Sequence, residues 1–350
     1  MSLRDELYDT AEALRECFSL DNRYNYRRMV AAGGFGSAHR VQYVNPDTQV
    51  VFDFLVKKAH DDDEAEEALM IEKNYLLPMR GGMHIAQLIV EIPDDPLEKA
   101  ASFGGLRGEW IFLEWVPNGT LYDFVEKARL IGVERLPNRL LWRFFLCLIR
   151  ACCGMAWPRN RHDGMVELEL PEPGEPLIGI AHNDLHTSNV LLGDFEIAGE
   201  HGITPILKII DFGLSTDSTE LEHEDIKETN LWEVGKIMLQ LITLDLDTTY
   251  ATTPVTIDYL GQNVQTRANP ILPPSSGSPS PFPWLDQWLA TVVSLCVATQ
   301  FDGVPTLQTL SVIVPYAVRE RNGEFYGVPE ESDQAIRDLC QEILYAPAAR

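Results

Sequence analysis

The chain has 350 residues, of which 45% are hydrophobic and 23% are charged. This composition supports a substantial buried core and excludes a disordered chain or a small disulfide scaffold. There are 28 Lys and Arg against 53 Asp and Glu, a formal net charge of −25. Nucleic acid and anionic membranes are therefore excluded as principal partners, and a basic or metal-neutralised partner is favoured.

The cysteines have no CxxC spacing, and most fall in apolar helical runs: Cys17, Cys147, Cys152, Cys153, Cys296 and Cys340. They are interpreted as buried reduced thiols, with a metal or redox role as the alternative. The first thirty residues are charged, and no apolar run approaches the roughly 20 residues of a membrane span. We therefore expect a soluble intracellular protein, cytoplasmic or nuclear.

Apolar residues recur at helical spacing in the first segment, at Leu3, Leu7, Ala11, Leu14 and Phe18. They predict an amphipathic helix within residues 1–26 that lies on a larger body. Short β-rich runs follow at 50–56, 87–91 and 110–115, with one helical stretch at about 64–77. Beyond residue 121 the predicted helices cover 140–155, 231–244, 285–299 and 333–345. A small sheet with one main helix is thus expected to precede a mostly helical lobe.

Three stretches are predicted to be loops or insertions, at residues 158–176, 194–204 and the Pro-rich 269–283. The acidic run at 61–67 carries six carboxylates in seven positions. It is interpreted as a solvated helix start, where negative charge suits the helix dipole, with a site for a basic partner as the alternative.

A glycine-rich stretch lies between two predicted strands and comprises Ala31, Ala32, Gly33, Gly34, Phe35, Gly36, Ser37 and Ala38. Glycines let a backbone approach a ligand closely and direct its N–H groups at phosphate oxygens, although a structural hairpin is an alternative. Lys57 ends an apolar strand 21 residues after Gly36, where it would face such a phosphate. Glu72 is the expected carboxylate partner of Lys57, with Glu66 and Glu67 as rivals.

The strongest signal is a pair of blocks at residues 181–192 and 207–213. Asp184, Asn189 and Asp211 each lie beside a short apolar strand in these blocks. Two carboxylates and a carboxamide supply hard oxygen ligands for Mg²⁺ and an acceptor for a substrate hydroxyl proton, which phosphoryl transfer requires.

In this order, from about residue 27 to 310, the blocks resemble the catalytic domain of eukaryotic protein kinases. The resemblance implies an α+β, bilobal fold with a small five-stranded antiparallel N-lobe at 27–116 and a mostly helical C-lobe at 117–350. It implies ATP and Mg²⁺ as cofactors, with Lys57 on the α- and β-phosphates and Glu72 holding Lys57. Asp184 would be the base of the catalytic loop (182–189), and Asn189 and Asp211 would bind Mg²⁺, the latter in the DFG triplet (211–213).

The same resemblance implies an adenine slot. Leu113 would be the gatekeeper, backbone groups of Glu114 and Val116 would bind the adenine edge, and Thr120 would contact the ribose. The remaining slot residues would be Ala38 and Leu55 above the ring and Leu191 below it. Leu55 filling the slot is the alternative. Leu76, His182 and Phe212 would stack as an internal spine.

Several positions depart from the family. Ala31 replaces the first loop glycine, and Asn183 replaces the Arg that would receive a phosphorylated activation loop, so switching by loop phosphorylation is not expected. His186 replaces a Lys and resembles the loop of small-molecule kinases, where it would contact the γ-phosphate.

Only 19 positions separate Asp211 from Asn230, which opens a block resembling the start of the central C-lobe helix, and no APE triplet lies between. Val304 stands where the family has the Arg that pairs with the APE glutamate, consistent with that loss. The interval carries Asp217, Glu220, Glu222, Glu224, Asp225 and Glu228 against Lys227. It is interpreted as a solvated acidic loop, with recognition of a cationic substrate as the alternative.

The expected function is transfer of the γ-phosphoryl of ATP to a Ser or Thr hydroxyl of a protein. The alternatives are a kinase for a small-molecule hydroxyl acceptor and a nucleotide-binding pseudokinase that serves as a binding module. The expected partners are ATP and a hydroxyl acceptor, either a protein or a small molecule, for which positive charge is left open as an alternative; neither nucleic acid nor a membrane is expected.

Overall fold

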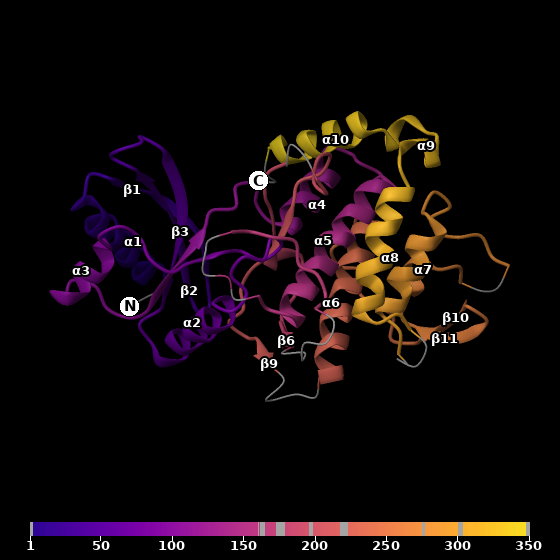
Figure 1. Cartoon of the computed structure of the whole chain (residues 1–350), viewed down its shortest axis with the longest axis horizontal. Helices are drawn as coiled ribbons and strands as arrows, with labels where there is room; N and C mark the ends of the chain where they lie inside the picture. The colour runs from indigo at the N-terminus through magenta and orange to yellow at the C-terminus, as the bar shows by residue number, and fades with distance from the viewer. Residues whose placement is uncertain are drawn as a thin grey trace.

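The protein is described by a computed structural model that covers residues 3–159, 161, 165–172, 179–195, 199–217, 223–274, 277–299 and 304–347, with the backbone alone at residue 3 and at 223–228. The fold is α+β. Figure 1 shows a β-sheet with helices α1–α3 at one end and helices α4–α10 gathered at the other.

One five-stranded antiparallel sheet, ordered β1-β2-β3-β5-β4, forms the sheet region. Its strands are β1 (Tyr24–Gly33), β2 (Gly36–Val44), β3 (Val51–Ala59), β4 (Leu88–Ile89) and β5 (Trp110–Glu114). The five antiparallel strands agree with the expectation, although the run predicted at 87–91 forms only the two-residue strand β4. β3 is central and alternates buried and half-buried side chains, so Lys57 and its neighbours Val56 and Lys58 point to opposite faces.

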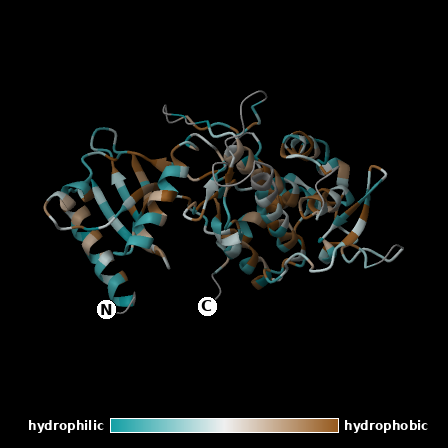
Figure 2. Ribbon diagram, turned by 90° about the horizontal axis from the view of Figure 1, so that it is seen from below, coloured by the Kyte–Doolittle hydropathy of each residue, from teal (hydrophilic) through white to brown (hydrophobic). Residues whose placement is uncertain are grey.

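Helix α1 (Leu3–Ser19) packs on one face of the sheet, as its apolar spacing predicts. Leu14 and Phe18 are fully buried there, and the Phe18 ring lies 5.6 Å from that of Tyr24. Figure 2 shows hydrophilic and hydrophobic residues side by side along this helix. A further short helix, α3 (Pro96–Ser102), joins the same cluster through Leu97 and was not predicted.

Helix α2 (Asp63–Leu76) follows β3 and begins within the acidic run. Asp62 caps it by accepting a hydrogen bond from the backbone N–H of Ala65, and the first turn is acidic. The predicted helix start is therefore confirmed. The buried face of α2 carries Ala65, Leu69, Glu72 and Leu76, so one carboxylate lies in an otherwise apolar stripe.

The helical region is built around α5 (Asn138–Ala156), in which every residue except Arg143 is buried. The surrounding helices are α4 (Leu121–Leu130), α6 (His223–Thr243), α7 (Gln287–Cys296), α8 (Leu307–Glu320), α9 (Gly323–Tyr326) and α10 (Asp333–Tyr345). Large apolar side chains such as Trp142 and Phe145 fill its core. No described helix has the length and hydropathy needed to cross a bilayer.

Two short antiparallel strand pairs lie within residues 180–217, between the sheet region and most of the helical region in the chain. β7 (Val190–Leu192) pairs with β8 (Leu207–Ile209), and β6 (Ile180–Ala181) pairs with β9 (Thr216–Asp217). A 3₁₀ turn, η1 (Thr187–Asn189), leads into β7. These pairs bring residues 182–189 next to residues 209–217.

Two predictions about the helical region were wrong. Helix α6 begins at His223, not at residue 231, so Glu224, Asp225 and Glu228 are helical instead of belonging to a loop; Glu220 and Glu222 lie outside the described residues. The residues of its first two turns are mostly polar and lack apolar periodicity, so the pattern placed the start too late.

A β-hairpin was also missed. β10 (Val255–Tyr259) pairs with β11 (Gln262–Thr266) across Leu260 and Gly261, both of which have positive φ. The alternation of Val255, Ile257 and Tyr259 before a glycine turn was a usable signal. The Pro-rich stretch that follows contains the 3₁₀ turn η2 (Asn269–Ile271).

Candidate functional site

Lys57 joins two carboxylates from distant parts of the chain. Its Nζ lies 2.5 Å from Glu72 Oε2 on α2 and 2.8 Å from Asp211 Oδ1 beyond β8. The expected partner Glu72 is thus observed. Its rival Glu66 instead lies near Gly108, where an added Cβ would meet both Glu66 Oε1 and Lys58 Nζ.

Burial and charge oppose each other in this triad. Burial alone would lower the pKa of Lys57, but the two carboxylates outweigh it and hold that pKa above its usual value. Burial raises the pKa of Glu72 despite Lys57. The pKa of Asp211 is lowered, because Lys57 outweighs the effect of burial there. Asp211 is 45% exposed and Glu72 only 2%, so Asp211 is the carboxylate that a ligand can reach.

Residues 184, 186 and 189 form a second group. Asn189 Nδ2 donates to the backbone oxygen of Asp184 at 2.9 Å and to its Oδ2 at 3.1 Å, and lies 3.3 Å from His186 Nε2. His186 Nε2 is 3.5 Å from Asp184 Oδ2. Asn189 is buried, whereas Asp184 and His186 are 43% and 41% exposed. The buried amide therefore fixes a carboxylate that stays open to solvent.

The two groups are held side by side by backbone pairing. Val190 pairs with Ile209, and the N–H of Ile210 donates to the Asn189 oxygen at 3.0 Å. The buried ring of His182 contacts this junction: its Nε2 donates to the Ile210 oxygen at 3.0 Å, and its ring centroid lies 4.8 Å from that of Phe212. Burial lowers the pKa of His182 although Asp211 and Asp184 oppose the shift. The two rings touch at an interplanar angle of 53°, so His182 and Phe212 are neighbours as expected for the spine but are tilted and not stacked.

Two residues of the site have a left-handed backbone. Asp211 has φ 69° and Asn183 has φ 63°, a conformation that costs energy in residues other than glycine. Asn183 Nδ2 donates to the Leu214 oxygen at 3.0 Å and to Thr216 Oγ1 at 2.9 Å. Asn183 thereby holds residues 182–184 against residues 214–216, a role that the sequence analysis missed.

Asn230 makes a similar link from α6. Its Oδ1 accepts the His182 N–H at 3.0 Å, and its Nδ2 donates to the Ile180 oxygen at 2.8 Å. The next turn carries Glu233. Burial raises the pKa of its carboxyl to about 7, and the negative charge of Asp184 adds to the rise, whereas a hydrogen bond from the Leu185 N–H partly offsets it. Sequence analysis did not single out Glu233. Its place in a mostly apolar helix was the available signal.

The glycine-rich turn joins β1 to β2, with Gly33 paired to Gly36 and Ala31 to Ala38. Gly36 has φ 157°, and a Cβ there would lie 2.2 Å from the Lys58 oxygen, so the fold itself requires this glycine. Gly33 and Gly34 have open space around them, and Phe35 is exposed. Packing among the described residues therefore does not explain Gly33 or Gly34.

Most residues expected around adenine lie on β2, β3, β5 and β7, whereas Val116 and Thr120 lie between β5 and α4. Leu113 and Val116 are buried, Leu55 pairs with Leu113 across the strands, and Ala38, Leu55 and Leu191 are half-buried. The Thr120 side chain caps α4 in a reciprocal pair with Asp123. The Glu114 side chain binds Lys208 Nζ at 2.6 Å. Both side chains thus have structural partners that sequence analysis missed.

No family model matches the chain, and a search of curated proteins finds no match either.

Proposed function

We propose that this chain is an ATP- and Mg²⁺-dependent phosphotransferase with a bilobal, kinase-like fold that phosphorylates a Ser or Thr hydroxyl of a protein. The observation that carries the proposal is the position of Lys57 between Glu72 and Asp211, next to the Asp184–Asn189 pair. A cation held by one buried carboxylate and shared with an exposed one suits the phosphates of a nucleotide.

The donor set fits Mg²⁺. Asp211 offers a half-exposed carboxylate with a lowered pKa, and Asn189 directs its Nδ2 at Asp184, which leaves its amide oxygen on the opposite side of the planar group. Mg²⁺ bound by Asn189 and Asp211 would neutralise phosphate charge. Asp184 would orient the acceptor hydroxyl, since its exposed carboxylate is fixed by Asn189. Gly33 and Gly34, which packing does not explain, leave room for phosphates.

A small-molecule acceptor is the second candidate, because His186 stands exposed beside Asp184 where protein kinases have Lys. The early start of α6 at His223 favours the same candidate, since it shortens the segment on which a peptide would bind.

The test is phosphoryl transfer from labelled ATP with Mg²⁺ to a generic basic protein and, separately, to small hydroxyl compounds. Asp211→Asn is expected to lower the rate by about 100-fold or more, because catalysis of this kind is positioning and electrostatics. The control is Asp53→Asn, which also removes an ion-paired carboxylate, at 3.0 Å from Arg40 in the sheet, and should change the rate less than about twofold.

Label entering only small molecules would establish the second candidate. Thermal stabilisation by ATP without turnover, unaltered by Asp184→Asn, would overturn both and leave a nucleotide-binding module.

A further inference from the structure

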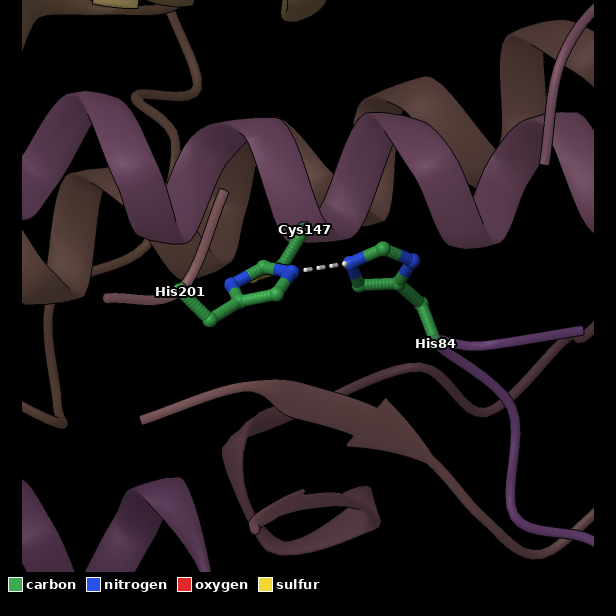
Figure 3. A group of neighbouring side chains, drawn as sticks. All are labelled: His84, Cys147 and His201. Atoms are coloured by element: carbon green, nitrogen blue, oxygen red, sulfur yellow. Dashed lines mark hydrogen bonds between the residues drawn. The ribbon is translucent and has the colours of Figure 1, made fainter. Parts of the chain in front are cut away.

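A second polar cluster lies inside the helical region and plays no part in the proposed reaction. It comprises His84, before β4; Cys147, in the middle of α5; and His201, before β8. All three are fully or almost fully buried. Figure 3 shows the two imidazoles edge to edge beneath α5, with Cys147 projecting from the helix toward them.

The ligand atoms of the cluster converge. His84 Nε2 lies 3.0 Å from His201 Nε2, Cys147 Sγ lies 3.7 Å from His201 Nδ1, and one ligand atom from each residue fits within 4.8 Å of the others. A tetrahedral ion with bonds of about 2.0 Å to nitrogen and about 2.3 Å to sulfur spaces its ligand atoms by about 3.3–3.6 Å. The two short contacts use different nitrogens of His201, whereas a single ion binds only one of them. Since one ligand atom from each residue lies within 4.8 Å of the others, the side chains would have to close by about 1 Å to bind the ion.

Glu169 fixes the orientation of His84. Its Oε2 lies 2.7 Å from His84 Nδ1, and its Oε1 accepts the His84 backbone N–H at 2.6 Å. Nδ1 is thereby engaged and Nε2 faces the cluster, which is the carboxylate–histidine arrangement that supports bound metals. Gly154 of α5 makes room for this carboxylate, since a Cβ there would lie 2.9 Å from Glu169 Cγ.

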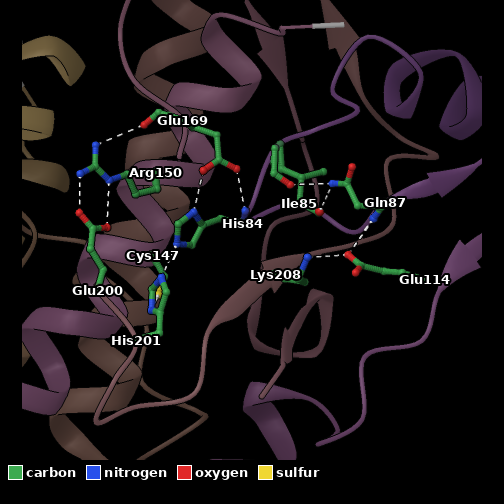
Figure 4. A network of polar contacts seen from close by, with 11 residues as sticks. His84, Ile85, Gln87, Glu114, Cys147, Arg150, Glu169, Glu200, His201 and Lys208 are labelled. Carbon is green, nitrogen blue, oxygen red and sulfur yellow. Dashed lines mark hydrogen bonds and ion pairs between the residues drawn. The ribbon is translucent and has the colours of Figure 1, made fainter. Parts of the chain in front are cut away.

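The surroundings hold the other segments in place. Arg150 lies one turn after Cys147. Its Nη2 donates to the Glu200 carboxylate at 2.7 Å, and its Nη1 donates to the backbone oxygen of Glu169 at 3.3 Å. Figure 4 shows this network extending from Glu200 through Arg150 to Glu169 and His84. Glu200 precedes His201 in the chain, so the arginine also positions that ligand.

We propose that His84, Cys147 and His201 bind one Zn²⁺ ion. Two imidazole nitrogens and one thiolate are borderline-to-soft donors, which select Zn²⁺ over Mg²⁺ or Ca²⁺. On binding, Cys147 releases its thiol proton to solvent, and the proton that lies between the two imidazoles is released to solvent as well. The described residues offer no fourth ligand within the cluster, so a water molecule completes the coordination. The ion would join three segments that are far apart in the sequence.

The metal-free alternative is a hydrogen-bonded relay from Cys147 through His201 and His84 to Glu169. Burial alone would raise the pKa of Cys147, but the two imidazoles lower it to about 6. Burial alone would lower the pKa of His84, but Glu169 raises it to about 9. The relay would hold protons where the metal site holds Zn²⁺, so the two states compete and zinc affinity should increase with pH.

The experiment measures metal binding to the full-length protein. Chelator-treated protein is titrated with Zn²⁺, and with Co²⁺ as a spectroscopic probe. We expect one Zn²⁺ per chain, a melting temperature higher by at least about 3 °C, and with Co²⁺ the thiolate charge-transfer band and the intense visible bands of a tetrahedral site.

Cys147→Ala should abolish these signals, with a loss in zinc affinity of about 100-fold or more. The matched control is Cys152→Ala, since Cys152 is equally buried on the same helix, and it should bind Zn²⁺ as the wild type does. Equal zinc affinity in the wild type and Cys147→Ala, or a Co²⁺ complex without the charge-transfer band, would overturn the proposal and leave the relay. The cobalt spectrum of the wild type decides this even where a variant fails to fold.

Discussion

The Lys57 triad and the His84 cluster both adjoin the strand β8. Asp211 follows β8 by two residues, and the His84 oxygen accepts the N–H of Ile209, the last residue of β8. In the first group Asp211 is 45% exposed; in the second Glu169 is 3% exposed and His84 fully buried. An exposed carboxylate that loses its partner can bind water or another group instead. A buried carboxylate has no such replacement, so the loss of its partner destabilises the fold. We therefore expect changes in the first group to affect ligands and the reaction, and changes in the second to affect folding.

The sharpest test of this contrast is Glu169→Ala. It leaves the backbone N–H and the ring nitrogen of His84 buried without partners and opens a cavity against Gly154. We expect a loss of about 3–5 kcal/mol in the free energy of unfolding, measured by urea denaturation. Glu167→Ala serves as the control, because Glu167 is 43% exposed and pairs with Arg159 and Arg161 on the surface; its loss should be below about 1 kcal/mol.

Glu169→Gln refines this comparison. An amide can still accept the His84 backbone N–H and can donate to the ring, so the relay can run in the opposite direction. We expect its loss of stability to fall between those of the two alanine variants. Equal losses in the free energy of unfolding for Glu169→Ala and Glu167→Ala would mean that the buried ion pair contributes no more to stability than the surface one.

Glu233 is half-buried, whereas Glu169 is buried, and the pH dependence of stability tests what this partial burial does. Its carboxyl pKa is raised from 4.5 to about 7, so between these values the native state retains a proton that the unfolded state releases. The native state is therefore favoured below pH 4.5, and this contribution is lost as the pH rises through 7. Relative to Glu233→Gln, the wild type should lose about 1–2 kcal/mol over that window, since the group retains some contact with solvent.

Urea midpoints between pH 4.5 and 8 measure this difference. Glu320→Gln, at an exposed position ending α8, should follow the wild type at every pH. Parallel curves for the wild type and Glu233→Gln would show that the carboxyl of Glu233 titrates as it does in water.

The two polar clusters also differ in how far the sequence predicts them. Glu72 lies one helical turn from Leu69 and Leu76, so a carboxylate within a buried stripe indicated an ion pair with the lysine of the preceding strand. The His84 cluster has no such pattern. Its three members come from two loops and the middle of an apolar helix, and only the tertiary path of residues 199–206 brings His201 to Cys147. Cys147 was expected to be a buried reduced thiol, and it is a buried free thiol, but its two imidazole neighbours could not be predicted.

Helix starts were predicted correctly where apolar periodicity coincided with a capping residue. They were misplaced where the first turns of the helix lack that periodicity. Asp62 precedes a periodic segment, so the start of α2 was correct to within a residue. The first turns of α6 lack periodicity, and its start was placed eight residues too late. The left-handed backbone of Asn183 and Asp211 depends on tertiary hydrogen bonds, which no spacing in the sequence reveals.

Asn183 provides the test with the smallest expected effect, because its side chain is exposed and it precedes Asp184 in the exposed site, outside the buried His84 cluster. Asn183→Ala removes the hydrogen bonds to Leu214 and Thr216 and places a Cβ-bearing residue without them at φ 63°. Asn183→Gly removes the same bonds but tolerates the backbone. We expect about 1–2 kcal/mol of destabilisation for alanine and about half of that for glycine.

The effect should also be local. Since β9 pairs with β6 through only two residues, amide hydrogen exchange at Thr216 and Asp217 should accelerate by about tenfold, while exchange in α5 is unchanged. If alanine and glycine accelerated exchange equally, backbone strain at Asn183 would have no part in holding this segment. If exchange rose across α5 as well, the exposed group would be as tightly coupled to the core as Glu169 is, and the contrast between the two clusters would fail.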